Sequence, residues 1–272
     1  MRQHSREVSR MTLFKHEMKQ SKLSLITWTA SIGFLMATCV LLFPEMKGEM
    51  DSVSDMFASM GSFSAAFGMD RISFGSLDGF YAIECGNILG LGGAFFAAYC
   101  AVTILAKEEK DHTAEFLMTH PVSRVSIITE KLAAVLTQIV IMNVLTLAIS
   151  IGSMYIVGEE IPWKNILLMH LAYFLMQLEI GGICFGISAF VRRGGIGIGL
   201  GIAVMMYFLN IVANISDKAE FVKYITPFGF SDGADIITNG EIDALMVCIG
   251  MALGIAGIIA AYIKYTKKDI NP

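Results

Sequence analysis

Charged residues are scarce in this chain, and their scarcity excludes most soluble folds. Asp, Glu, Lys and Arg make up 16% of the 272 residues, against about 25% in an ordinary soluble domain. Apolar types make up 55% and the mean hydropathy is +0.63, which is more apolar surface than a soluble core of this size uses. With 5 prolines and a net charge of −4, disorder, collagen, coiled coil and nucleic-acid binding are excluded as well. These absences leave a polytopic membrane protein.

Long apolar runs are what the sequence has instead. A membrane-spanning helix needs about 20 apolar residues to cross about 30 Å of hydrocarbon, and six stretches qualify: 23–43, 83–106, 132–157, 166–191, 194–215 and 244–263. The runs are continuous rather than alternating, which indicates helices and not a β-barrel. We therefore predict an all-α integral membrane protein, a single transmembrane domain over 1–272 with six spans.

The lysines and arginines are unevenly divided between the two sides that six spans define. Fifteen of the 20 lie in the termini and in the loops 107–131 and 192–193, and five lie in the loops 44–81, 158–165 and 216–243. Because positive residues favour the cytoplasmic side, we expect a multi-pass protein of the cell membrane with both termini cytoplasmic. The first apolar run is too long for a signal peptide and no small-residue cleavage site follows it, so we expect a retained span.

The residues that catalysis and metal binding need are also missing. The 5 cysteines form no CxxC pair and lie near no histidine at ligand spacing, so no disulfide or metal site is expected. The GFSDG segment at 229–233 matches a nucleophile elbow, but no histidine follows it and no sheet is predicted. No Gly-Lys dipeptide occurs, which excludes the GxxxxGK[ST] phosphate-binding loop. We predict no catalytic residue and no cofactor in this chain; an ATPase, if one drives it, is another protein.

Segments outside the spans carry apolar residues of their own. In 1–22, Val8, Met11, Phe14 and Met18 recur at helical spacing among basic residues. This pattern favours a short amphipathic helix on the membrane surface over a solvated basic tail. The outer loops 44–81 and 216–243 are too apolar for flexible linkers, and we expect short helices in both.

The loop 107–131, KEEKDHTAEFLMTHPVSRVSIITEK, is the one substantial loop on the predicted cytoplasmic side. Thr113 can cap a short helix over 114–119, Pro121 ends it, and Ser123 can cap the helix that continues into the third span. An apolar patch with a charged rim is typical of a docking surface. The apolar members of this patch are Phe116, Leu117 and Met118.

Glu179 is the one ionisable residue well inside a predicted span. An acid in the membrane is costly and is therefore a functional candidate, as a proton or cation site or as part of a translocation path. The alternative is structural: a neutral or hydrogen-bonded glutamate that faces Gln138 or Asn143 on the third span. The sequence leaves both open.

Glycines spaced by four residues occur in the last three spans, where they allow helix backbones to approach closely. The dense run at 194–201 predicts that the fifth span is a close-packing or deformable element. Whether it packs within one subunit or forms a dimer contact stays open. The pairs are Gly182/Gly186, Gly195/Gly199, Gly197/Gly201 and Gly250/Gly254.

The loop after the second span carries a family resemblance. KEEKDHTAEFL at 107–117, HPVSR at 120–124 and EKL at 130–132 resemble permease subunits of type-2 ABC exporters, whose usual form is near EExxGTxExLL, xPVSR and xK. His112 departs from this form, because the family usually has glycine there. SAFVRR at 188–193 and TPF at 226–228 are similar to the family too, so the likeness covers nearly the whole chain, although only 108–131 is specific.

The resemblance implies a permease subunit with no nucleotide site of its own. Two such subunits, identical or homologous, pair around a central path in the lipid bilayer, and each binds a separate ABC ATPase subunit that holds ATP and Mg²⁺. The cargo is hydrophobic or amphipathic (a drug, a peptide antibiotic or a lipid-like compound) and moves outward. The implied ATPase-coupling residues are Glu108, Glu109, Asp111, Thr113, Glu115, Phe116, Leu117, Pro121, Ser123 and Arg124.

Two other functions remain open from the residues alone. The first is an ion- or proton-coupled secondary carrier that uses Glu179. The second is a membrane scaffold or sensor whose loop 107–131 binds a regulator.

Overall fold

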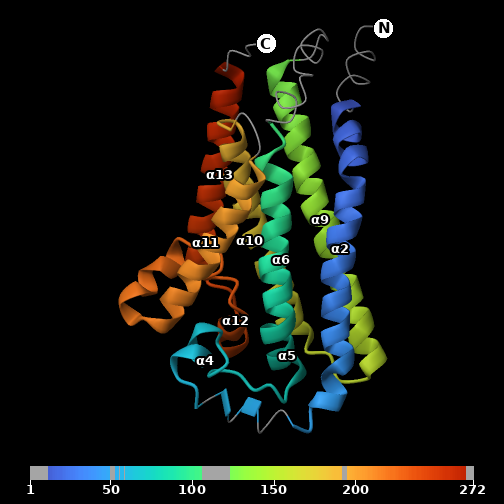
Figure 1. The fold of residues 1–272 in the computed structure, drawn as a ribbon, viewed down its shortest axis with the longest axis vertical. Helices are drawn as coiled ribbons and strands as arrows, with labels where there is room; N and C mark the ends of the chain where they lie inside the picture. The colour runs from blue at the N-terminus through green and yellow to red at the C-terminus, as the bar shows by residue number, and fades with distance from the viewer. Residues whose placement is uncertain are drawn as a thin grey trace.

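The computed structural model describes residues 12–49, 53–54, 56–57, 59–105, 123–191 and 195–267. In this part of the chain, six helical segments are long and apolar enough to cross a membrane, and no strand occurs (Figure 1). The six predicted spans and the all-α fold are therefore confirmed. The segments are α2 (Thr12–Met46), the continuous run of α5 (Leu77–Phe80), the π-helix η1 (Tyr81–Cys85) and α6 (Gly86–Val102), α9 (Arg124–Val157), α10 (Trp163–Ser188), α11 (Ile196–Ile215) and α13 (Ala244–Lys267).

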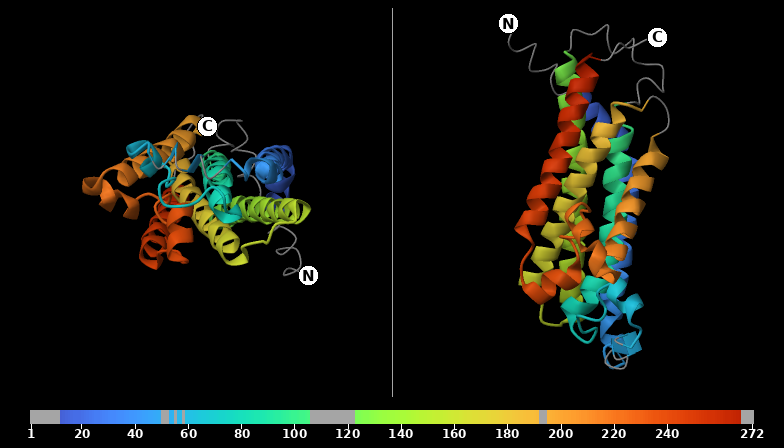
Figure 2. Two further views of the ribbon diagram at one scale, coloured as in Figure 1. Left: turned by 90° about the horizontal axis from the view of Figure 1, so that it is seen from below. Right: turned by 90° about the vertical axis from the view of Figure 1, so that its left-hand side faces the viewer.

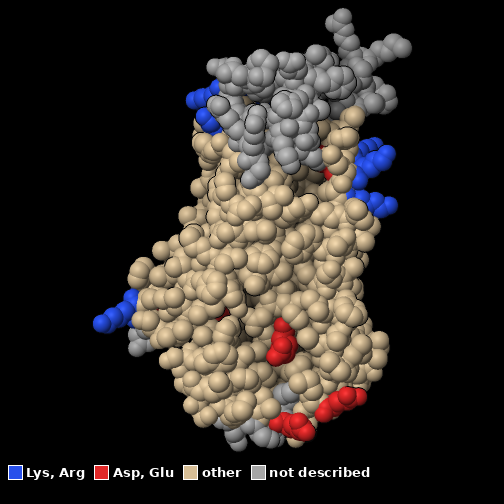
Figure 3. Space-filling model, in the orientation of Figure 1, with Lys and Arg blue, Asp and Glu red and all other residues tan. Residues whose placement is uncertain are grey.

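The helices run side by side between two different ends of the molecule. We call the end where α2 begins and α13 ends the terminal end, and the opposite end the loop end (Figure 1). The short elements α4 (Ser62–Ala66), η2 (Asp217–Tyr224) and α12 (Gly233–Asn239) belong to the loops 44–81 and 216–243, as the sequence predicts. On the face drawn in Figure 3, most Lys and Arg lie toward the terminal end and most Asp and Glu lie toward the loop end.

The first span is longer than its apolar run. α2 is one unbroken helix from Thr12 to Met46, so residues 12–22 continue the span instead of forming the separate surface helix expected over 1–22. Residues 1–11 lie outside the described part of the chain. Contacts at the first turn of α2 hold this extension of the helix in place.

α10 occupies the centre of the bundle. It packs against α13, α6 and α9, while α2 packs on α9 and α11 packs on α6. α2 and α11 consequently lie at opposite edges, as the view along the bundle shows (Figure 2). Large apolar side chains such as Leu23 and Ile156 are exposed on the outside, where hydrocarbon surrounds a membrane protein.

The closest helix contact joins α10 and α13 through glycine. A Cβ atom on Gly182 would lie 2.6 Å from the carbonyl oxygen of Gly254, and one on Gly186 would lie 2.6 Å from that of Gly257. Neither position has room for a side chain, so the two backbones touch. The close backbone approach predicted for the glycines spaced by four is confirmed for Gly182, Gly186 and Gly254, whereas Gly250 faces the side chain of Glu179.

The glycine run at the start of α11 divides between two faces. A Cβ on Gly195 would lie 3.1 Å from the carbonyl oxygen of Val102, and one on Gly199 would lie 2.9 Å from the Val102 Cγ1 atom. A Cβ on Gly197 or Gly201 would meet nothing within 4 Å. Gly195 and Gly199 thus pack α11 onto the end of α6 within one subunit, whereas Gly197 and Gly201 face outward.

Candidate functional site

Only two of the predicted ATPase-coupling residues lie in the described part of the chain, Ser123 and Arg124. The others, Glu108, Glu109, Asp111, Thr113, Glu115, Phe116, Leu117 and Pro121, lie outside it. Ser123 is the N-cap of α9, and its Oγ accepts a hydrogen bond of 3.1 Å from the backbone N–H of Ser126, as predicted. Arg124 Nη1 donates to the carbonyl oxygen of Thr266, near the end of α13, over 3.4 Å.

Glu130 joins α9 to the first turn of α2. Its Oε2 accepts hydrogen bonds of 3.0 Å from the backbone N–H groups of both Leu13 and Phe14. The first N–H groups of a helix have no partner within the helix, and a carboxylate there is favourable both as a cap and as a charge at the positive helix end. Glu130 therefore holds the start of α2 beside the start of α9.

Lys131 is the most deeply buried cation that the structure describes, with a side chain 0% exposed. Its Nζ lies 3.0 Å from Oε1 of Glu17 on α2 and donates to the carbonyl oxygen of Ile104 over 2.6 Å. Ile104 follows α6 directly. We call Glu17, Ile104, Glu130 and Lys131 the clasp. It joins α2 both to the segment that follows α6 and to the first turns of α9. Residues 106–122 connect these two places in the sequence.

The residues of the clasp are not predicted from the sequence to form a site. Glu130 and Lys131 enter it only through the family resemblance, and Glu17 is not singled out. One pattern does point to them: Glu17 is an acid in an otherwise basic segment, and Lys131 lies just before an apolar run. A charge that has to be buried needs a partner, but the sequence does not say which residue supplies it.

Glu179 lies on the face of α10 that packs against α13. Residues two apart on an α-helix point in nearly opposite directions. Gln177 faces α9, where its Oε1 accepts a hydrogen bond of 2.7 Å from Nδ2 of Asn143. Glu179 faces α13, where a Cβ on Gly250 would lie within 2.1 Å of its Oε2. The alternative in which Glu179 faces Gln138 or Asn143 is therefore wrong.

The surroundings of Glu179 are apolar. The side chain is fully buried, and neither carboxyl oxygen has a hydrogen-bond partner in the part of the chain that the structure describes. Gln138 is buried elsewhere and accepts a hydrogen bond of 3.5 Å from Sγ of Cys100. Glu179 therefore lies at the α10–α13 contact without a polar partner among the described residues.

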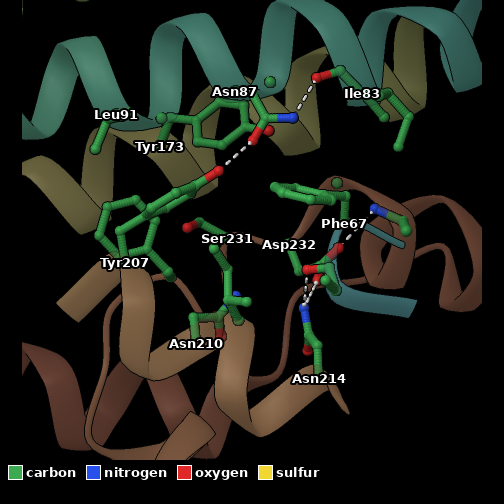
Figure 4. Close-up of a pocket in the computed structure, with 18 residues that line it drawn as sticks. Phe67, Ile83, Asn87, Leu91, Tyr173, Tyr207, Asn210, Asn214, Ser231 and Asp232 are labelled. Atoms are coloured by element: carbon green, nitrogen blue, oxygen red, sulfur yellow. Dashed lines mark hydrogen bonds between the residues drawn. The ribbon is translucent and has the colours of Figure 1, made fainter. Parts of the chain in front are cut away.

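A polar pocket lies toward the loop end, between α6, α10, α11 and the loop segments (Figure 4). Its volume is about 60 Å³. The hydroxyl of Tyr207 donates to Oδ1 of Asn87 over 3.1 Å. Tyr207, Asn210 and Asn214 follow one another at intervals of three and four on α11, which puts them on one face of an otherwise apolar helix. This polar face is absent from the predictions made from the sequence, although that spacing could have revealed it.

Ion pairs join the two long loops beside this pocket. Arg71 of the first loop pairs with Asp235 and, at 3.5 Å, with Asp232 of the last loop. Asp232 is also the N-cap of α12 and accepts a hydrogen bond of 3.1 Å from Nδ2 of Asn214. Burial opposes the charge of Arg71, but the nearby carboxylates outweigh it and raise the pKa of Arg71. The guanidinium thus stays charged and fastens one loop to the other.

The geometry describes a membrane bundle whose two long loops are joined to each other at one end. Among the described residues, no group of three His, Cys, Asp or Glu side chains could hold a metal ion. A comparison with curated protein sequences finds no match. A family model described as "ABC-2 family transporter protein" matches residues 11–269. The chain therefore belongs to the ABC-2 transporter family, and it is a membrane-spanning permease component of an ABC transporter.

Proposed function

We propose that this chain is the permease subunit of an ATP-driven exporter in the cell membrane. It moves a hydrophobic or amphipathic molecule outward, with both termini and the loop 106–122 in the cytoplasm. ATP and Mg²⁺ bind a separate ATPase subunit, and a second permease subunit, identical or homologous, completes the path. The family membership supports the transport class, and the distribution of Lys and Arg supports the orientation.

The clasp is the observation that carries this proposal. The ATPase docks on the segment 106–122, whose two flanks are both held by Lys131 and its neighbours: Ile104 on one side and the start of α9 on the other. A push on this segment cannot be absorbed by separating α6 from α9, because Lys131 on α9 donates a hydrogen bond to Ile104 at the end of α6. The same ammonium group also contacts Glu17 on α2. The movement is passed to three spans as one unit.

Docking can be tested by co-expressing this chain with a candidate ABC ATPase and measuring their co-purification. We expect Phe116→Ala, and separately Glu115→Lys, to lower recovery of the ATPase by about tenfold, as loss of a central interface contact does. Phe221→Ala is the matched control, because Phe221 is exposed at the loop end and should leave recovery unchanged. Equal recovery with Phe116→Ala, or transport by the permease alone on a proton gradient, would overturn the proposal.

Substitution of Glu179 separates the exporter from a proton-coupled carrier. Glu179→Gln keeps the size of the side chain and removes only its ability to ionise, so we expect ATP-dependent transport in proteoliposomes with the ATPase to be retained. A carrier that uses this carboxyl would lose transport altogether. Glu45→Gln, at an exposed position at the end of α2, controls for the purification of a Glu→Gln variant.

A further inference from the structure

Two cysteines from different spans lie side by side in the fold. All five cysteines are free thiols, and the sequence predicts no disulfide among them. Cys85 on η1 is 0% exposed, and its Sγ donates a hydrogen bond of 3.7 Å to the carbonyl oxygen of Met36 on α2. The thiols of Cys85 and of Cys39 on α2 are also hydrogen-bonded to each other. The fold thus brings together two thiols that the sequence separates.

The contact with Met36 locates the two sulfur atoms in a second way. Side chains on an α-helix lean back over the preceding turn, so a γ atom can lie beside the carbonyl oxygen three positions earlier. Ser153 and Ser188 show this in the same bundle, because each Oγ donates to that carbonyl oxygen, over 3.0 and 2.7 Å. Cys39 follows Met36 by three positions. A sulfur of Cys85 that reaches the Met36 oxygen therefore lies next to the side chain of Cys39.

The two thiols differ in exposure. Cys39 is partly exposed at the surface of α2, whereas Cys85 is buried. Thiol–disulfide exchange needs an accessible sulfur that attacks the reagent and a second sulfur close by that displaces the reagent from the first. Cys39 has the exposure that the first step needs, and Cys85 has the position that the second step needs.

The pair lies in the half of the bundle nearer to the loop end. Cys39 is two turns before Met46, where α2 ends, which corresponds to about 11 Å along the helix axis. In the proposed orientation this half faces the outside of the cell, where disulfides persist. Only this point rests on the proposed function, because the contact between the thiols is a property of the chain alone.

We propose that Cys39 and Cys85 form a reversible disulfide with a small disulfide dissolved in the membrane as the oxidant. The Cys39 thiol loses its proton, its Sγ attacks one sulfur of the oxidant, and the S–S bond of the oxidant breaks as one thiol leaves. The Cys85 thiol then loses its proton and attacks the Cys39 Sγ, and the second thiol leaves. The two cysteines give up two electrons together, and the oxidant leaves as two thiols that carry the two protons.

The disulfide and the clasp hold the same helix at different ends. The clasp joins the first turns of α2 to Ile104, directly after α6, and to α9. The disulfide joins α2, two turns before its last residue, to η1, which continues into α6. α2 is then fixed to the second span near both ends, so oxidation stabilises the bundle.

The disulfide is tested on the full chain in detergent, without the ATPase, with dithiodipyridine as the oxidant. We expect Cys39 and Cys85 to be recovered as one linked pair of peptides without a pyridylthio group, and the pair to release two thiopyridone molecules. Cys248, which is exposed on α13, is the internal control and should keep one pyridylthio group. A pyridylthio group retained on Cys39 beside a free Cys85, or no reaction at Cys39, would overturn the proposal even if the ATPase co-purifies.

Serine variants assign the two steps. In Cys85→Ser the second sulfur is missing, so Cys39 should keep its pyridylthio group. In Cys39→Ser the buried Cys85 should stay a free thiol. If Cys85 reacts in Cys39→Ser as completely as in the wild type, Cys39 does not make the first attack and the assignment is wrong.

Thermal unfolding in detergent measures what the bond does to the bundle. A disulfide restricts the unfolded chain, so oxidation should raise the unfolding temperature of the wild type by about 5 °C, and dithiothreitol should reverse the rise. Cys85→Ser, treated in the same way, should show no rise. A linked pair of peptides with an unchanged unfolding temperature would refute the stabilising role of the bond.

Discussion

Replacing Lys131 by Met is expected to uncouple and destabilise the protein. Met matches the length of the lysine stem but carries no charge, so the carboxylate of Glu17 loses the cation 3.0 Å away and Ile104 loses its donor. Breaking a buried ion pair by removing one partner costs about 3–5 kcal/mol, because a charge is left uncompensated in a medium of low dielectric constant. The free energy of unfolding in detergent and the ATP-driven transport of the reconstituted complex should both fall.

A second substitution separates stability from coupling. Glu17→Gln combined with Lys131→Met removes the buried ion pair as a whole and not one partner alone, so we expect stability to recover in part. Transport should stay low, because the double variant also lacks the Lys131 ammonium group that joins α2 to the end of α6. Lys22→Met makes the same change at an exposed position of α2 and should alter stability by less than about 0.5 kcal/mol. If transport recovers together with stability in the double variant, the clasp only stabilises the fold and does not transmit movement.

The architecture could be predicted from the sequence because span formation depends on local composition. Each apolar run must form its own backbone hydrogen bonds in hydrocarbon, so residue type and run length suffice to place the six spans. The unbroken course of α2 could not be predicted in this way. The helix runs on beyond the apolar run because Glu130 caps its first turn from α9, and that contact joins residues more than one hundred positions apart.

Side-chain partners were less predictable than spans, since the position of a residue along a helix does not say which neighbour it faces. Glu179 and Gln177 both lie within one apolar run, yet one faces Gly250 on α13 and the other faces Asn143 on α9. The relative rotation of three helices decides this. The polar pocket depends on the same packing, together with the ion pairs of Arg71 that hold the two loops over it. Residue spacing on α11 reveals one wall of the pocket, and only the fold brings the others to it.

Replacing Gly182 by Val is expected to disrupt the centre of the bundle. A Cβ at this position would lie 2.6 Å from the carbonyl oxygen of Gly254 and 2.9 Å from its Cα. Backbone atoms cannot move aside as the end of a flexible side chain does, so α10 and α13 must separate. Overpacking of this kind typically costs about 1–3 kcal/mol and more where the backbone has to shift. Because α10 also packs against α6 and α9, the effect should spread through the bundle. Thermal unfolding in detergent and the yield of monodisperse protein measure it.

The matched control for this variant lies on α11. Gly197→Val introduces the same side chain at a helix position where a Cβ meets nothing within 4 Å, so its expected effect is small. Valine and glycine differ in helix propensity by well under about 1 kcal/mol, in favour of valine. The comparison therefore isolates packing from propensity. If Gly182→Val unfolds at the temperature of Gly197→Val, α10 and α13 are not in backbone contact.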